Sequence, residues 1–144
     1  SCLCVSCVFF LMVWRPPAPP LFPSTSLFRS VESSLGTPTA GGITTLHRSS
    51  DLTVINVIWP PGMTIFPHDH HMWAVIGIYG GQEDNTFFRR TPQGLDRAGF
   101  KALDIQDSVG LGPEVIHAVH NPRNVLTGAV HVYGGDFFSE SRSE

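Results

Sequence analysis

Short segments rich in β-branched and aromatic residues, separated by turn-forming residues, make up most of the chain after residue 42. The clearest is segment 52–59, Leu-Thr-Val-Ile-Asn-Val-Ile-Trp, which is apolar at both alternating sets of positions and ends at Pro60-Pro61-Gly62. Such a segment is typical of a strand buried between two layers. The same signals predict strands at 63–66, 72–79, 86–90, 102–105, 114–119 and 125–133, with a turn at 92–100. The chain is therefore predicted to be all-β, a sandwich or a barrel.

The first 42 residues differ in composition from the rest. Residues 2–14 form an apolar run, shorter than the roughly 20 residues that a membrane-spanning helix needs, and a proline-rich tract follows it. Three interpretations are open: a cropped targeting segment, a mistranslated or fragmentary start, or a segment that packs on the domain. Residues 24–42 are rich in Ser, Thr, Gly and Pro and indicate a linker or the frayed end of an N-terminal helix, with only 27–35 suited to a helix. We expect a poorly structured extension at 1–42 and one domain at 43–144.

Size and charge limit the classes of function. With 144 residues and a mass of 15.8 kDa, the chain is long enough for one domain with a core. The formal charge of -3 provides no basic field, so neither nucleic acid nor a membrane is expected as a partner. The three cysteines, Cys2, Cys4 and Cys7, lie outside the expected domain and predict neither a disulfide framework nor a zinc ribbon. We expect a cytoplasmic protein, and these patterns leave its oligomeric state open.

Two histidines one residue apart follow the second predicted strand. In an extended backbone alternate side chains point to the same face, so His68 and His70 project into one space. Neutral imidazole is a common ligand for zinc, iron, copper and nickel, so the pair predicts part of a metal site. The alternative is a pair of exposed histidines in a loop. Asp69 points to the opposite face and is expected to anchor the turn, and His71 and His120 are expected at the surface or behind the site.

The surroundings of these histidines resemble the first motif of the cupin superfamily, in which one glycine stands before His-x-His and another follows it. Here Gly62, His68-Asp69-His70 and Gly80-Gly81 take those places. The second cupin motif ends in a histidine followed closely by an asparagine, as His117 and Asn121 do. The resemblance implies a single cupin barrel, a double-stranded β-helix or jelly roll, with His117 as the third metal ligand.

This chain lacks one residue of the usual cupin pattern, the glutamate ligand. Most cupins add a glutamate soon after the second histidine as a fourth ligand, whereas this chain has Ala74 and Val75 there. A site of three neutral histidines resembles that of the thiol dioxygenases. Segment 129–136 also resembles the Ser-x-His-x-Tyr strand of those enzymes, because His131 and Tyr133 match and Ala129 replaces the serine. By alternation Tyr133 can reach the ligands of the metal while His131 holds its hydroxyl.

This resemblance implies a non-haem Fe(II) enzyme that adds both atoms of dioxygen to a small thiol and forms a sulfinic acid. His68, His70 and His117 would bind the metal, and Tyr133 and His131 would be the catalytic residues. A thiolate is soft and anionic and suits a dicationic metal with open coordination positions, although another divalent metal could occupy the same ligands. The alternatives are a different metal-dependent cupin reaction and a non-catalytic cupin that binds a metal or a small ligand.

Three residues are candidates for binding the substrate: Trp73, Arg89 and Arg90. Cysteine dioxygenases of the mammalian type place an arginine before the first motif, but residues 39–45 contain none, so cysteine is not the expected substrate. Trp73 is a candidate for the wall of the pocket or for the core. Arg89 and Arg90 are adjacent on a predicted strand, so one of them is expected to point inward and to bind a substrate carboxylate. The alternative for the arginines is a salt bridge at the barrel rim with Glu83 or Asp84.

Overall fold

The computed structural model describes residues 31 and 33–139, and nine strands account for most of them. The strands are β1 (Gly42–Arg48), β2 (Thr53–Trp59), β3 (Thr64–His68), β4 (Ala74–Gly80), β5 (Gln82–Thr91), β6 (Gly94–Asp104), β7 (Ser108–Leu111), β8 (Ile116–His120) and β9 (Thr127–Tyr133). Residues 31 and 33–35 are helical, which agrees with the end of the helix predicted at 27–35. The rest of that predicted helix, and most of the expected extension, lie outside the described residues.

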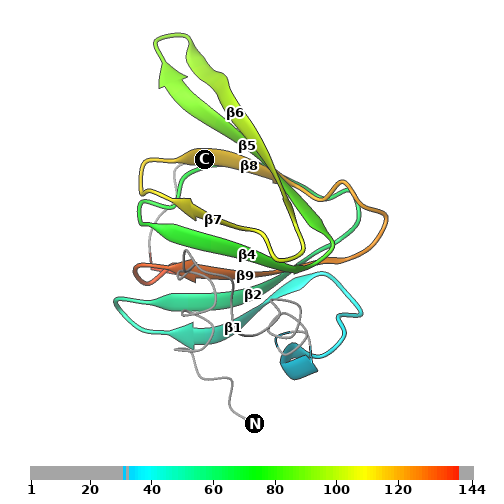
Figure 1. The fold of residues 1–144 in the computed structure, drawn as a ribbon. Helices are drawn as coiled ribbons and strands as arrows, with labels where there is room; N and C mark the ends of the chain where they lie inside the picture. Colours follow the sequence, from blue (N-terminus) through cyan, green and yellow to red (C-terminus); the bar gives the residue numbers. More distant parts are fainter. Residues whose placement is uncertain (1–30, 32, 140–144) are drawn as a thin grey trace, which may run out of the picture.

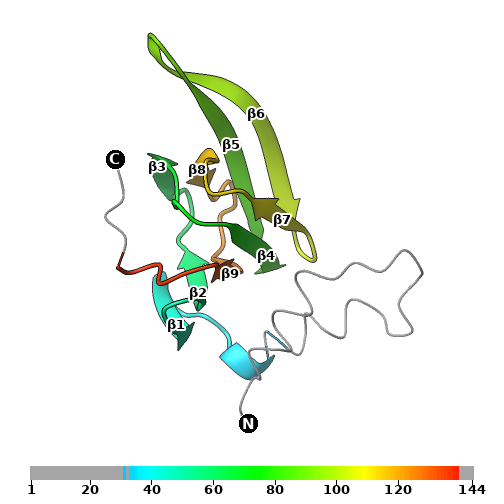
Figure 2. The same ribbon diagram turned by 90° about the vertical axis from the view of Figure 1, so that its left-hand side faces the viewer.

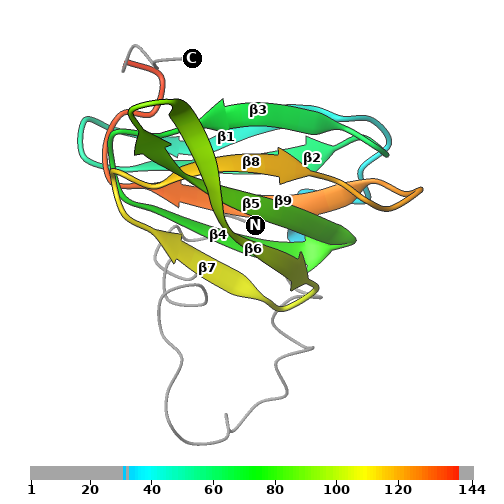
Figure 3. The ribbon, with the colours of Figure 1, turned by 90° about the horizontal axis from the view of Figure 1, so that it is seen from above.

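The strands form two antiparallel sheets (Figure 1). The larger sheet has the order β1-β2-β9-β4-β7, and the smaller has the order β3-β8-β5-β6. Seen from above, β3, β8 and β5 lie over the larger sheet (Figure 3). The prediction of an all-β, double-stranded β-helix architecture is confirmed. Within residues 31 and 33–139, no helix is long and apolar enough to cross a membrane.

Strand β2 is buried along its whole length, as its two apolar faces predict. One face, with Ile55, Val57 and Trp59, joins the core between the two sheets. The other face packs with residues of β9 and with Val31 of the helical segment in a second cluster. Both faces of β2 are therefore covered by other residues, which explains why its sequence is mainly apolar on both faces.

The turn predicted at 92–100 is wrong. The turn is confined to residues 92 and 93, and β6 pairs with β5 from Thr91 opposite Gly94 back to Gln82 opposite Asp104. The hairpin extends well beyond the rest of the smaller sheet (Figure 2). Most of β6 is exposed there, so its sequence does not alternate between apolar and polar residues. Strand signals that depend on burial are for this reason absent from 94–100.

Strands β1 and β7 were not predicted either. Each lies at an edge of the larger sheet, and β7 has only four residues. Edge strands bury few side chains, and β1 is exposed over most of its length. The predicted strands at 52–59, 63–66, 72–79, 86–90, 102–105, 114–119 and 125–133 all correspond to observed strands, with boundaries that differ by a few residues or, in β5 and β6, by more.

Candidate metal centre

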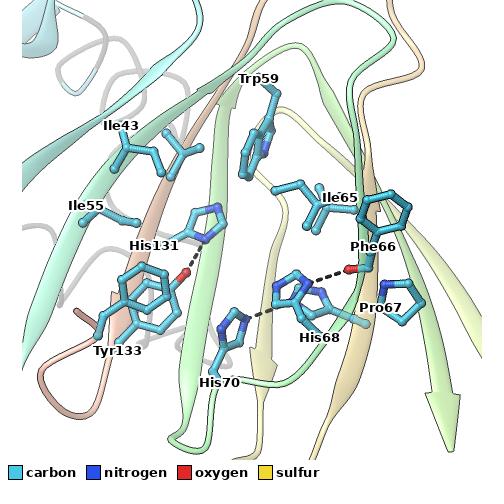
Figure 4. Close-up of a pocket in the computed structure, with 14 residues that line it drawn as sticks. Ile43, Ile55, Trp59, Ile65, Phe66, Pro67, His68, His70, His131 and Tyr133 are labelled. Atoms are coloured by element: carbon cyan, nitrogen blue, oxygen red, sulfur yellow. Dashed lines mark hydrogen bonds between the residues drawn. The ribbon is translucent and has the colours of Figure 1, made fainter. Parts of the chain in front are cut away.

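The side chains of His68, His70 and His117 converge between the two sheets, and Figure 4 shows His68 and His70 close together at the edge of a cavity. His68 ends β3 and lies opposite His117 of β8 in the pairing register, while His70 follows β3 in the loop that leads to β4. One nitrogen from each ring lies within 4.8 Å of the others. The Nε2 atoms of His70 and His117 are 3.0 Å apart. The three histidines predicted as ligands are thus brought together, and their arrangement can hold a metal ion.

The turn before β3 is fixed to the loop after β8. The side-chain amide of Asn121 donates to the backbone oxygens of Trp59, Pro60 and Val125, and Asn121 is fully buried. Gly62 has a φ of 71°, in the left-handed region that favours glycine, and its N–H donates to the backbone oxygen of Asn121. These contacts set β3 beside β8, so the glycine and the asparagine of the two motifs support the site without touching the metal position.

Hydrogen bonds prepare two of the rings as metal ligands. Nδ1 of His68 lies 2.8 Å from the Phe66 carbonyl oxygen, which can only accept, so the proton is on Nδ1. Nδ1 of His117 is likewise 2.7 Å from Oδ1 of Asn85. Both rings therefore keep a lone pair on Nε2. This donor set fits a cation of the kind that imidazole binds, such as iron or zinc.

His117 is neutral at physiological pH. Burial, together with the nearby His68 and His70 rings, lowers its pKa from 6.5 to about 2. A protonated ring could not bind a metal, so this shift keeps the ligand available over a wide pH range. The low pKa also makes the metal-free fold sensitive to acid.

We expect the metal-free protein to lose stability on acidification. Between the unfolded pKa of 6.5 and the folded pKa of about 2, His117 binds a proton in the unfolded state and not in the folded state. The free energy of unfolding therefore falls as the pH drops through this window, with a limiting slope of about 1.4 kcal/mol per pH unit from this group. Urea unfolding in a chelator, from about pH 7 to about pH 5, measures the slope. His117→Gln should make it shallower; equal slopes for the two proteins would contradict the assignment.

A cavity of about 470 Å³ opens beside the three histidines. Its walls are mainly apolar and include Ile55, Ile65 and Phe137. His131 and Tyr133 also line it, and Nδ1 of His131 is 2.9 Å from the Tyr133 hydroxyl oxygen (Figure 4). The rings of His70 and Tyr133 are 5.1 Å apart. The three histidines, His131 and Tyr133 therefore line the same cavity.

Solved structures with the same arrangement of sheets come from cupins, although no family model matches this sequence. An RmlC-like cupin with a double-stranded β-helix fold from Methanocaldococcus jannaschii is 12% identical, with a TM-score of 0.56 over 71% of this chain and 86% of that one. An RmlC-like cupin from Shewanella frigidimarina is 18% identical, with a TM-score of 0.53 over 68% of this chain and 80% of that one. The chain has the cupin fold.

Oxalate oxidase in complex with glycolate is also similar to this cupin barrel. It is 14% identical, with a TM-score of 0.54 over 69% of this chain, which spans 53% of the oxidase chain. At such identities the likenesses show the fold alone, because one fold carries many reactions. The reaction of this chain therefore depends on the residues of its site.

The predicted substrate-binding residues lie apart from the cavity. Arg89 and Arg90 are both exposed, so the expectation that one of them points inward is wrong. The Arg90 guanidinium pairs with Asp69 at 3.1 Å, not with Glu83 or Asp84. Asp69 also lies 3.1 Å from Nε2 of His71, so it ties the loop after β3 to the hairpin, as a turn anchor should. Trp73 is 40% exposed and lies outside the cavity lining.

Sequence reasoning missed two polar residues behind the site. Glu83 and Asn85 alternate along β5 and are both 0% exposed. The Asn85 amide donates to Glu83 and contacts His117, and the Trp59 indole also donates to Glu83, at 2.6 Å. The period of two in β5 could have indicated that both side chains share the inner face with half-buried Phe87. They were missed because two polar residues at alternating positions are typical of the exposed face of a strand.

Proposed function

We propose that this cupin is a non-haem Fe(II) dioxygenase that oxidises a small thiol to a sulfinic acid. Fe(II) held by His68, His70 and His117 would supply the redox chemistry with dioxygen. The proposal rests above all on the Tyr133–His131 pair, which lines the same cavity as the three histidines. A protein that only stores a metal has no need of a hydroxyl positioned beside it.

The overall reaction needs no other reductant or oxidant. A thiol and one dioxygen molecule give a sulfinic acid: two S–O bonds form, the O–O bond breaks, and sulfur gives up the four electrons that reduce both oxygen atoms. The thiol proton leaves sulfur and ends on the sulfinic acid or in solvent. Three histidine ligands would add no negative charge to the metal. The metal would keep open coordination positions and its positive charge for an anionic sulfur.

Tyr133 and His131 move the thiol proton in this proposal. The Tyr133 oxygen accepts the proton from sulfur, while its own proton passes to Nδ1 of His131 across the 2.9 Å hydrogen bond. The imidazolium that results lies 3.7 Å from the Glu83 carboxylate. Both partners are almost fully buried, so the charge pair is screened little by water.

The lining of the cavity favours a thiol without a carboxylate. No arginine or lysine is among the described residues that line it, and an unpaired carboxylate is costly to bury. We therefore expect kcat/KM for 3-mercapto-1-propanol to exceed that for 3-mercaptopropionate, a chain of equal length, by about tenfold or more. Oxygen uptake by the iron-loaded protein, with sulfinate formed mole for mole, measures both rates. Cysteine and cysteamine extend the comparison to amino-substituted thiols.

The outcomes of this experiment separate the alternatives. Oxygen uptake with sulfinate formation for any of the thiols supports a thiol dioxygenase, and the rank order tests the role of the lining. Tight metal binding with no uptake for any thiol would favour a non-catalytic cupin or a different cupin reaction, and would overturn the proposal. The replacement of the usual serine by buried Ala129 makes that comparison necessary.

A further inference from the structure

Glu83 is a buried acid that no step above requires as a ligand or as a proton carrier. Its side chain has no exposed surface. Trp59 Nε1 donates to its Oε2 at 2.6 Å, and Asn85 Nδ2 donates to its Oε1 at 2.9 Å. Nε2 of His131 is 3.7 Å from the same Oε2, near enough for charge attraction but beyond hydrogen-bond length. Three side chains that belong to the site thus converge on one carboxylate.

The carboxylate is ionised in spite of its burial. Burial by itself raises the pKa of Glu83, but His131, with the Asn85 amide and the Trp59 indole, outweighs it and holds the pKa below the ordinary value. An ionised carboxylate can only accept hydrogen bonds. The groups that face its two oxygens must therefore be hydrogen-bond donors.

Asn85 connects this order of donors and acceptors to His117, one of the proposed metal ligands. Because Glu83 only accepts, Asn85 must turn its NH₂ group towards it and its Oδ1 towards His117. Oδ1 only accepts as well, so His117 must carry its proton on Nδ1. Nε2 of His117, which faces Nε2 of His70, is thereby left with its lone pair. Two hydrogen bonds, from Asn85 to Glu83 and from His117 to Asn85, therefore connect the carboxylate to the ring that would bind the metal.

We propose that Glu83 is a positioning residue that fixes the metal-binding tautomer of His117 through Asn85. The proposal rests on the metal site proposed above. Outer-shell partners of this kind typically change metal affinity by 10–100-fold. The same carboxylate faces Nε2 of His131 and so favours the state in which Nδ1 accepts from Tyr133.

Glu83→Gln tests this order with little change in shape. The new carboxamide has one acceptor and one donor, whereas both of its neighbours, Trp59 and Asn85, donate. The indole cannot reverse its polarity but the Asn85 amide can turn over, so its NH₂ group comes to face Nδ1 of His117. The ring proton is then displaced to Nε2. We expect affinity for Co²⁺, measured by titration calorimetry, to fall by about 10–100-fold.

A second substitution should restore the order. In Glu83→Gln/Asn85→Asp the carboxamide donates to the new carboxylate, which also accepts from Nδ1 of His117, and the network keeps one negative charge. We expect the double variant to bind Co²⁺ within about threefold of the wild type, as strongly coupled residues should. Long-range ¹H–¹⁵N correlation spectra of the metal-free proteins should show His117 protonated on Nδ1 in the wild type and the double variant.

Asp84→Asn is the matched control, since Asp84 is the neighbouring half-buried acid on β5 and contacts Gln82 instead of the site. Its Co²⁺ affinity should equal that of the wild type. A folded Glu83→Gln protein with wild-type affinity, or a double variant that binds no better than Glu83→Gln, would overturn the proposal. Absence of Co²⁺ binding by the wild type would instead contradict the metal site itself.

Discussion

His70→Ala is expected to weaken the binding of a divalent metal by about 100-fold or more, and to abolish thiol oxidation with it. Loss of an outer-shell partner already costs 10–100-fold, so the loss of one ligand of three should exceed that. His70 is 5% exposed and borders the cavity, so water can occupy the space that its ring leaves. The fold should persist, since β3 and β8 are held by backbone pairing and by Asn121. Titration calorimetry with Co²⁺ measures the affinity.

The neighbouring histidine provides the control. His71 has a φ of 55° and pairs with Asp69 at the surface of the loop, away from the cavity. His71→Asn retains a residue that tolerates this backbone and removes the imidazole. Its metal affinity should match that of the wild type. Equal losses in His70→Ala and His71→Asn would show that the loop, not the ligand, controls binding and would refute the assignment of His70.

Tyr133→Phe is expected to lower kcat by about 100-fold while metal affinity changes little. The ring should stay in place, because it stacks on Phe137 at 4.1 Å between centroids. Only the hydroxyl that accepts the thiol proton is lost, and a positioned acid or base typically contributes 10²–10⁴-fold. The buried Nδ1 of His131 loses its partner, which should cost about 1–3 kcal/mol of stability. Steady-state oxygen uptake and urea unfolding measure the two effects.

The chain contains two tyrosines, and the other serves as the control. Tyr79 is 5% exposed, and its hydroxyl donates to Asn56 at 2.8 Å, in the second core cluster on the far side of the larger sheet. Tyr79→Phe should lose a similar amount of stability and keep its kcat. A Tyr133→Phe protein with wild-type turnover would remove Tyr133 from the reaction.

Local patterns were sufficient for the centre of the fold. The convergence of His68 and His70 and the two apolar faces of β2 depend on neighbours in the sequence, and both agree with the structure, although His70 lies just beyond the end of β3. His117 lies opposite His68 because β3 pairs with β8, and no spacing along the sequence indicates that pairing. Only the role of His117 as the third ligand was predicted, from the resemblance to cupins, whose second motif His117 and Asn121 match.

The misplaced residues depend on contacts between distant strands. Arg90 faces Asp69 because the hairpin passes beside the loop after β3, and no feature of β5 alone indicates that neighbour. Glu83 was named, with Asp84, only as an alternative partner for the arginines at the barrel rim, where an acid is normally solvated. It is buried because β5 pairs with β8, which brings His117 to Asn85 and encloses the inner face of β5.

Oxidation of a thiol under ¹⁸O₂ by the iron-loaded protein tests the central claim most directly, with the product mass as the readout. We expect the wild type to form a sulfinate in which both oxygen atoms carry the label, and His70→Ala to form none. A disulfide as the main product, or a sulfinate in which solvent supplies an oxygen atom, would contradict a thiol dioxygenase at the three-histidine site.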